Sequence, residues 1–283
     1  MLVAPAVLLV LLFKGLPLVL GFYESTRQWR GASPEHFGVG LANYERLVSD
    51  PATQAAFQNA LVVLATLPIW VLVPLVFAVL INERTPGWKF FRSVYFLPYI
   101  IAPIIVGLIF RQILAPDGAI NTVLNRVGLG AVTRTWLADP ATALPVLIVV
   151  ALWSFFGFGV LTYLAGLAAI DEDLFNAAIV DGAGFWARLR YVVIPSLRDV
   201  IGYWTILTTA GMLIWMFPLI FALTQGGPGF ETMMPEFLVF ITTFQFLDRG
   251  FGTAIGMVLF VVVALVSAMT VRNLYARAAR DGT

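Results

Sequence analysis

Six long apolar stretches limit what this chain can fold into more than any other feature of its sequence. A helix needs about 20 residues to cross a hydrocarbon core about 30 Å thick, and each stretch is near that length. Together they cover residues 2–23, 61–81, 93–110, 143–170, 200–223 and 252–271. The pattern predicts an all-α integral membrane protein with six transmembrane helices, formed as a single domain over residues 1–283.

The other segments are expected to be loops, with one exception. The apolar run at 237–247 is about half the spanning length, which favours an interfacial or re-entrant helix. The stretch at 143–170 is longer than a span requires, so it tilts or continues into water as a soluble turn. We expect the first stretch to be a retained helix rather than a cleaved signal peptide, because Lys14 interrupts its apolar core. Lys14 itself is either a functional intramembrane charge or a side chain that snorkels or meets a neighbouring helix.

Composition excludes several classes of function. Of the 283 residues, 60% are hydrophobic and 12% charged, against roughly half and a quarter in soluble proteins, so a lipid bilayer is the expected surrounding. The 17 Lys and Arg residues nearly balance the 16 Asp and Glu residues, which argues against a nucleic-acid partner. The chain has no Cys and a single His, His36, in a polar stretch. We therefore expect no disulfide and no metal centre.

Basic residues divide the segments between the spans into two sets. The denser set contains Arg84, Lys89, Arg92, Arg188, Arg190, Arg198, Arg272, Arg277 and Arg280. The sparser set, spread over a much greater length, contains Arg27, Arg30, Arg46, Arg111, Arg126, Arg134 and Arg249. Because short cytoplasmic segments are enriched in Lys and Arg, the denser set is expected inside. Both termini would then be cytoplasmic, with outer loops at about 24–60, 111–142 and 224–251.

Signatures of catalysis and nucleotide binding are absent from the sequence. A P-loop requires G-x-x-x-x-G-K-[ST], yet Lys14 is followed by Gly15 and Lys89 by Phe90. Acidic residues are confined to loops and span ends, and no G-x-S-x-G occurs. We therefore expect that this chain is not an enzyme and has no catalytic residue. If ATP drives this protein, another subunit hydrolyses it.

The segment between the fourth and fifth spans, residues 171–197, has the pattern of two short helices joined by a turn. Asp171 is a good N-cap, and the carboxylates after it complement the helix dipole. Gly182 and Gly184 permit a sharp change of direction, and Pro195 ends the second helix. The faces of the two helices are formed by Leu174, Ala177, Ala178 and Asp181, and by Phe185, Trp186 and Leu189.

This loop resembles the EAA motif of ABC importer permeases, E-A-A-x-x-D-G-A followed by an aromatic-containing helix and I-x-L-P. The matching residues are Ala177, Ala178, Asp181, Gly182, Ala183, Trp186 and Pro195. Ile194 replaces the Leu before the proline, and Asp171 stands where the family often has Pro. Asn176 replaces the usual Glu, which keeps hydrogen bonding but removes the charge.

Three more elements extend the resemblance over nearly the whole chain. Residues 40–44 are similar to the family's G-L-x-N-Y/F, residues 91–98 to F-R-x-x-x-F-L-P, and residues 224–229 to T-x-G-G-P. Together they resemble the carbohydrate-uptake branch, and within it the maltose and trehalose importer permeases. The resemblance implies the type I ABC importer permease fold, as a multi-pass protein of the bacterial cytoplasmic membrane (the cell inner membrane).

The resemblance also implies a function and partners. Such a permease would move a sugar, disaccharide or glycerol-phosphate derivative inward by alternating access. The coupling helix, the first helix of the loop, would dock on an ATP-binding subunit through Asn176, Ala177, Ala178, Asp181, Gly182, Ala183 and Trp186. Expected partners are two ATP-binding subunits, which hold ATP and Mg, a second related permease in a heterodimer, and an extracytoplasmic solute-binding protein. The chain itself is expected to bind no cofactor. The solute, and a heteromeric or homomeric pore, are left open.

Contacts to a sugar would come from hydrogen-bonding groups and from aromatic rings that face its C–H groups. On the fifth span, one helical face carries Trp204, Thr208, Met212 and Trp215, flanked by Tyr203 and Thr205. Comparable residues on the fourth span are Trp153, Phe156 and Tyr163. Aromatic side chains in membrane helices also pack against neighbours or lie at the interface, which is the alternative for each of them.

Two other functions compete with import. A passive channel would use similar spans, but it would need no loop that docks an ATPase. A polytopic membrane enzyme would need a cluster of carboxylates or His within the spans, and the sequence has none.

Overall fold

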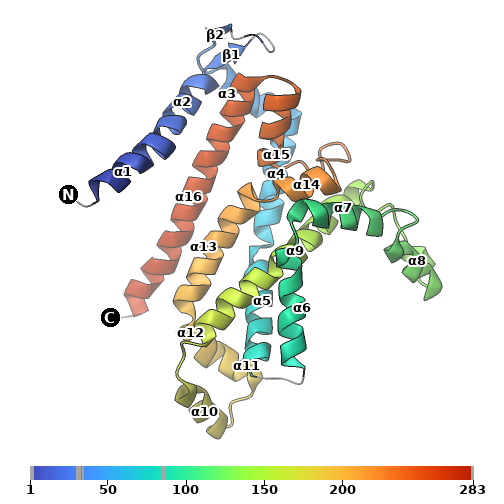
Figure 1. Ribbon diagram of the computed structural model, residues 1–283, viewed down its shortest axis with the longest axis vertical. Helices are drawn as coiled ribbons and strands as arrows, with labels where there is room; N and C mark the ends of the chain where they lie inside the picture. Colours follow the sequence, from blue (N-terminus) through green and yellow to red (C-terminus); the bar gives the residue numbers. More distant parts are fainter. Residues whose placement is uncertain (1–2, 30–32, 34, 84–86, 282–283) are drawn as a thin grey trace.

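The computed structural model describes residues 3–29, 33, 35–83 and 87–281, and this part of the chain is almost entirely helical. Residue 2 of the first expected span, Arg30 and Arg84 lie outside these residues. The long helices run along one another, with a β-hairpin at one end of the bundle and short loop helices at the other (Figure 1). The all-α fold predicted from the sequence is confirmed.

Within the described residues, four helical segments are long and apolar enough to cross a membrane. They lie at the first, second, fourth and sixth expected stretches. The first is built from α1 (Ala4–Val10), the π-helical η1 (Leu11–Gly15) and α2 (Leu16–Ser25). The second is built from α4 (Pro51–Ala65) and α5 (Leu67–Asn82). The remaining two are α9 (Pro140–Leu167) and α16 (Arg249–Asp281), whose apolar part reaches Arg272.

The third and fifth expected stretches are broken helices. α6 (Trp88–Ile100) and α7 (Pro103–Ile113) meet at 103°, and α13 (Arg198–Ile214) and α14 (Phe217–Leu223) at 44°. Pro103 disfavours helical geometry in the residue before it, and residues 101 and 102 have ψ angles of 129° and 132°. The expectation of one helix over 93–110 is therefore wrong. If each bent pair counts as one span, the number of candidate spans is six.

Several segments expected to be loops contain regular structure. α4 begins at Pro51 rather than near residue 61, because the N–H and hydroxyl of Thr53 both donate to Asp50 Oδ2, at 2.9 and 2.7 Å. The other elements in these segments are β1 (Arg27–Trp29), β2 (His36–Gly38), α3 (Ala42–Ser49), α8 (Ala119–Arg126) and the 3-10 helix η2 (Gly130–Val132). They are short and contain no long apolar run, so apolar length alone did not reveal them.

The short apolar run after the fifth span is helical, as predicted. It forms α15 (Pro235–Phe240) and the π-helical η4 (Ile241–Gln245), which pack against α16. At the other end of the bundle, the predicted pair of loop helices is formed by α10 (Glu172–Val180), α11 (Phe185–Arg188), the π-helical η3 (Leu189–Val193) and α12 (Ile194–Ser196).

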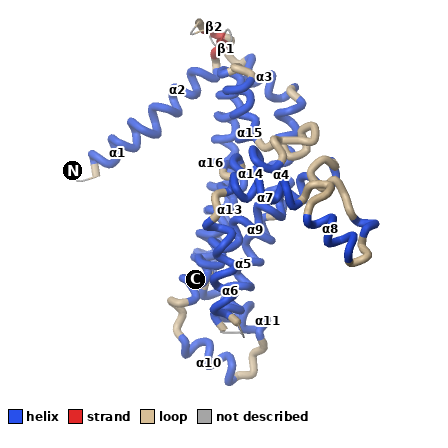
Figure 2. The backbone as a smooth tube through the Cα atoms, turned by 45° about the vertical axis from the view of Figure 1, so that its right-hand side comes forward, coloured by secondary structure: helices blue, strands red, loops and turns tan. Residues whose placement is uncertain are grey.

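Buried side chains form two clusters along the bundle. One, which includes Leu147, Ile220 and Ile255, joins α9, α14 and α16 toward the hairpin end. The other, which includes Leu75 and Tyr163, joins α5 and α9 toward the loop helices. The first apolar segment has no buried position in its most apolar window, and α2 packs against α16 (Figures 1 and 2). That segment is therefore covered by lipid or by another chain.

Candidate functional site

The first loop helix, α10, is capped at both ends as the sequence predicts. At its start, the backbone N–H of Asp173 donates to Asp171 Oδ1 at 3.0 Å. At its end, the N–H of Gly182 donates to Ile179 O at 3.0 Å and that of Ala183 to Ala178 O at 2.9 Å. This pair of bonds is a Schellman motif, and Gly182 has the left-handed φ of 76° that the motif requires. Gly182 is therefore the turning point of the loop.

The second loop helix fixes the loop to the bundle. It runs through α11, η3 and α12 and ends at Ser196, one residue after Pro195. Leu189 and Val193 are buried in the cluster that includes Leu75 and Tyr163, and Phe175 of α10 and Phe185 pack against the same cluster. Apolar packing therefore joins the loop helices to the bundle, and Figure 2 shows α10 at the end of the bundle opposite the hairpin.

Much of the apolar surface of the loop helices is uncovered. Val180, which is not one of the predicted docking residues, is 86% exposed, and Trp186, which is one of them, is 70% exposed. The other predicted docking residues are exposed or half-buried, namely Ala177, Ala178, Asp181, Gly182 and Ala183. An exposed apolar surface of this kind on a small element is typical of an interaction site. Asn176 differs from the rest, because it lines a groove of about 390 Å³ that faces the end of α5.

Arg188 also lines this groove, and it was not predicted as a site residue from the sequence. Its Nε and Nη2 donate to Glu83 Oε1 at 3.2 and 2.6 Å, and its Nη1 donates to Ala183 O at 2.7 Å. Glu83 is the C-cap of α5 and stands 105 positions away in sequence. No local pattern could have revealed this contact, because neither residue belongs to a motif that includes the other.

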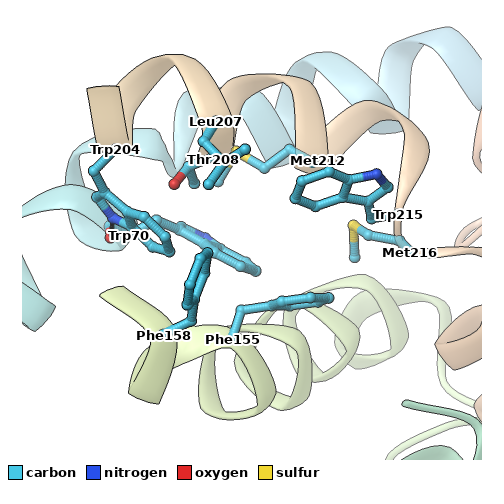
Figure 3. Close-up of a pocket in the computed structure, with 10 residues that line it drawn as sticks. Trp70, Phe155, Phe158, Trp204, Leu207, Thr208, Met212, Trp215 and Met216 are labelled. Atoms are coloured by element: carbon cyan, nitrogen blue, oxygen red, sulfur yellow. Dashed lines mark hydrogen bonds between the residues drawn. The ribbon is translucent and has the colours of Figure 1, made fainter. Parts of the chain in front are cut away.

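A second candidate region is an aromatic pocket between α5, α9 and α13 (Figure 3). It is lined by Trp70, Phe155, Phe158, Trp204, Leu207, Thr208, Gly211, Met212, Trp215 and Met216. The predicted face of the fifth span is therefore brought together in one place. Trp204 Nε1 donates to Trp70 O at 3.0 Å, which fixes α13 to α5 at one edge of the pocket.

Thr208 is the hydroxyl-bearing residue that lines the pocket. Its side chain is buried, and its Oγ1 has no hydrogen-bond partner among the described residues. A buried hydroxyl without a partner is unfavourable, and such an atom is a ready site for a ligand that can hydrogen-bond. The space that water-sized molecules can occupy in the pocket is about 30 Å³, enough for about two water molecules. A sugar ring would therefore enter only if the helices moved apart.

The remaining predicted pathway residues lie outside this pocket. Trp153 packs against Phe110 at a centroid distance of 5.1 Å, and Phe156 makes edge contacts with Phe77 and Tyr95. Tyr163 is fully buried. Tyr203, which flanks the pocket face on α13, is 56% exposed. On α9 the pocket instead receives Phe155 and Phe158, which the sequence analysis did not select.

A buried carboxyl stands where α13 bends into α14, next to the pocket. The backbone N–H groups of Met216 and Phe217 donate hydrogen bonds to Glu236 of α15, while its Oε1 has no partner in the described part of the chain. Glu236 thus joins α15 to the bend between α13 and α14.

The described residues contain no cluster of three or more His, Cys, Asp or Glu side chains that could hold a metal ion. His36 stacks on Trp29 in the hairpin, with ring centroids 5.2 Å apart.

Comparisons with known proteins agree on one family. Residues 37–281 match the profile of the binding-protein-dependent transport system inner membrane component family. The lactose transport system permease protein LacF of Rhizobium radiobacter is 30% identical over 278 residues, which cover 97% of this chain and 92% of LacF. The trehalose/maltose transport system permease protein MalF of Thermococcus litoralis is 31% identical over 265 residues, which cover 93% of this chain and 88% of MalF.

Solved structures show the same fold. A bacterial ABC transporter involved in the import of the acidic polysaccharide alginate contains a chain that superposes with a TM-score of 0.82 at 22% identity, covering 96% of this chain and 93% of that one. The alginate transporter in complex with an alginate pentasaccharide-bound periplasmic protein gives a TM-score of 0.80, also at 22% identity, covering 95% of this chain and 91% of that one.

The capping of α10 generates a prediction for Gly182→Val. Apart from its two chain neighbours, no described residue lies within 4 Å of the position that a Cβ would take at Gly182, so the cost is conformational and amounts to about 1–2 kcal/mol. Amide hydrogen exchange in residues 172–183 should accelerate by about tenfold, while expression and membrane insertion stay unchanged. Gly184→Ala is the control, because Gly184 has an ordinary φ of −68°. Equal exchange in the Gly182→Val variant and the wild type would contradict the assignment.

Proposed function

The chain belongs to the binding-protein-dependent transport system inner membrane component family, and on this premise we propose that it is the permease subunit of an ATP-driven importer for a carbohydrate-type solute. The observation that carries the proposal is a capped helix, α10, whose exposed surface has no partner within the described chain, in a protein without a nucleotide-binding motif. Such a helix suits a site where a separate motor subunit docks.

The partners follow from what the chain lacks. Two ATP-binding subunits would bind ATP and Mg, one of them against α10. Asp171, Asp173 and Asp181 are exposed at the two ends of α10, so a basic cleft is the complementary surface. A second, related permease would complete the pore and cover the first span, which has no buried position in its most apolar window. An extracytoplasmic binding protein would deliver the solute.

The mechanism is alternating access driven through the loop helices. Closure of the two ATPases would displace α10, and the attached helices would rock so that a central pathway opens to one side at a time. Gly182→Val should therefore also uncouple solute entry from ATP hydrolysis, because it changes the direction of α10 relative to the helix that follows the turn.

A carbohydrate-type solute is supported by the relatives and by the chemistry of the aromatic pocket. The relatives are named for lactose and for trehalose and maltose. Tryptophan rings stack on the C–H faces of sugars, and the unpartnered Thr208 hydroxyl can bond a sugar hydroxyl. We propose that Trp204, Thr208, Met212 and Trp215 touch the passing solute, with Trp70, Phe155 and Phe158. Trp153, Phe156 and Tyr163 would act through packing, whereas Tyr203, which is 56% exposed on α13, would contact the solute from the flank of the same face.

The location follows from the same premise. We propose the bacterial cytoplasmic membrane, with both termini and the loop helices inside. The distribution of basic residues supports this orientation, and the loop helices lie at the end of the bundle opposite the hairpin (Figure 1).

The proposed function is tested by reconstitution. The chain is purified with its genomic partner subunits, inserted in liposomes and supplied with the binding protein, whose solute is first found by a thermal-shift screen against sugars. Loaded binding protein should stimulate ATP hydrolysis and solute entry, whereas the chain purified alone should hydrolyse no ATP. Solute entry without ATP would indicate a passive channel, and hydrolysis by the isolated chain would indicate an enzyme.

The orientation is tested with two matched variants, which the absence of Cys from the chain makes possible. Val48 is 76% exposed near the hairpin end, and Val180 is 86% exposed on α10. In intact cells that lack the ATPase subunits, an impermeant thiol reagent should label Val48→Cys and spare Val180→Cys. Permeabilisation should then expose the second site. The opposite pattern in intact cells would reverse the topology.

The pocket is tested by Thr208→Val. Replacement of an unsatisfied buried hydroxyl by a methyl group should leave the complex as stable as the wild type or slightly more stable. Uptake at saturating solute should fall by about fivefold, the factor for one lost hydrogen bond. Thr209→Val is the matched control, because Thr209 Oγ1 already donates to Thr205 O at 2.7 Å. Wild-type uptake by Thr208→Val would remove this hydroxyl from the pathway.

A further inference from the structure

Arg188 joins three separate parts of the chain at the end of the bundle that carries the loop helices. In the proposed orientation this end is cytoplasmic. Arg188 belongs to α11, it bonds the carbonyl of Ala183 in the turn after α10, and it pairs with Glu83 at the end of α5. The Arg188 and Glu83 side chains are 16% and 24% exposed, so water screens their interaction only in part. Two donors of one guanidinium reach the same carboxylate oxygen, which fixes direction as well as distance.

Apolar packing leaves a gap between α10 and the end of α5. This gap is the groove of about 390 Å³, lined by Asn82, Glu83, Phe175, Asn176, Ile179 and Arg188. Beyond the groove, Leu189 and Val193 of the second loop helix share the buried cluster that includes Leu75 of α5. Across the groove itself, the ion pair of Arg188 with Glu83 is a direct polar link between the loop helices and α5.

α5 continues from this link to the aromatic pocket. Trp70 precedes Glu83 by 13 positions along the same helix, a distance of about 20 Å. Its indole lines the pocket, and its carbonyl accepts the Trp204 bond. Pro74 lies between the two ends and contacts α9 at Gly159, where an added Cβ would come within 3.0 Å of the proline ring. A displacement of Glu83 therefore reaches the pocket along one packed helix.

We propose that Arg188 and Glu83 are positioning residues that carry the displacement of α10 and α11 to α5, and through α5 to the aromatic pocket. This inference rests on the proposed function, because it concerns how an ATPase-driven movement reaches the pathway. Movement of the coupling helix, α10, would then reach α5 through a charged hydrogen bond that lies outside the docking face.

The test uses the whole importer in liposomes and compares solute entry per ATP hydrolysed. Glu83→Gln should assemble and hydrolyse ATP at the basal rate, but its ratio of entry to hydrolysis should fall by about tenfold, the factor for one charged hydrogen bond. The charge-exchanged pair Glu83→Arg with Arg188→Glu should recover most of the ratio. Asp248→Asn is the control, because it removes an ion pair with Arg46 of the same 2.6 Å length near the hairpin end. Its ratio should not change.

A chemical crosslink between positions 83 and 188 tests whether the pair transmits movement or only stabilises the fold. In a cysteine-free importer, Glu83→Cys with Arg188→Cys should lose coupling, and a short bifunctional maleimide that joins the two thiols should restore it. The proposal is overturned if Glu83→Gln keeps the wild-type ratio, if it fails to assemble, or if the bridged variant stays uncoupled. If the wild-type importer itself shows no stimulation by loaded binding protein, the proposed function fails, and that result is distinguishable from all of these.

Discussion

The structure depends first on the lack of hydrogen-bond partners in hydrocarbon, where each backbone N–H and C=O must be bonded within the protein. Continuous helices meet this demand without help, and α9 and the apolar part of α16 do so. The places where helices break are the informative ones, since each break frees backbone groups that something else has to satisfy. In this chain the breaks are marked by prolines and by polar side chains.

Two of these places lie beside the aromatic pocket. Between α4 and α5, Thr66 Oγ1 donates to Val63 O and accepts from Trp70 Nε1 at 3.0 Å, so the junction also orients a pocket indole. Between α13 and α14, Glu236 accepts from the freed N–H groups of Met216 and Phe217. Irregular backbone at membrane depth is tolerated where protein covers it or a cavity adjoins it. The breaks thus concentrate the adjustable parts of the chain around the one place proposed to meet the solute.

Sequence reasoning found the features that depend on local pattern. Apolar length located the helices of all six expected spans, capping residues located α10, and helical spacing gathered Trp204, Thr208 and Met212 on one face. It missed the break in the third span, because apolar length averages over Pro103. On α9 the rotation of the helix is set by close approach of Gly157 to Tyr95 O and of Gly159 to Pro74. That rotation turns Phe155 and Phe158 to the pocket, and helical period alone could not predict it. Contacts such as Arg188 with Glu83 depend on chain topology and carry no local signal.

The α4–α5 segment has polar contacts with other elements on both sides of the pocket, and its middle is held mainly by apolar packing. Asn59 donates to the carbonyls of Phe230 and Met233 at 2.8 and 2.9 Å near the hairpin end, and Glu83 pairs with Arg188 at the other. At the pocket, the hydrogen bond from Trp204 Nε1 to Trp70 O joins α5 to α13. The rest of the contact is aromatic and methionine packing, which has no fixed direction. Separation of the helices at the pocket would break this packing and the Trp204 bond, but neither of the polar contacts at the ends. The unpaired Thr208 hydroxyl adds to this, because a solute that enters satisfies it and lowers the free energy of the opened form.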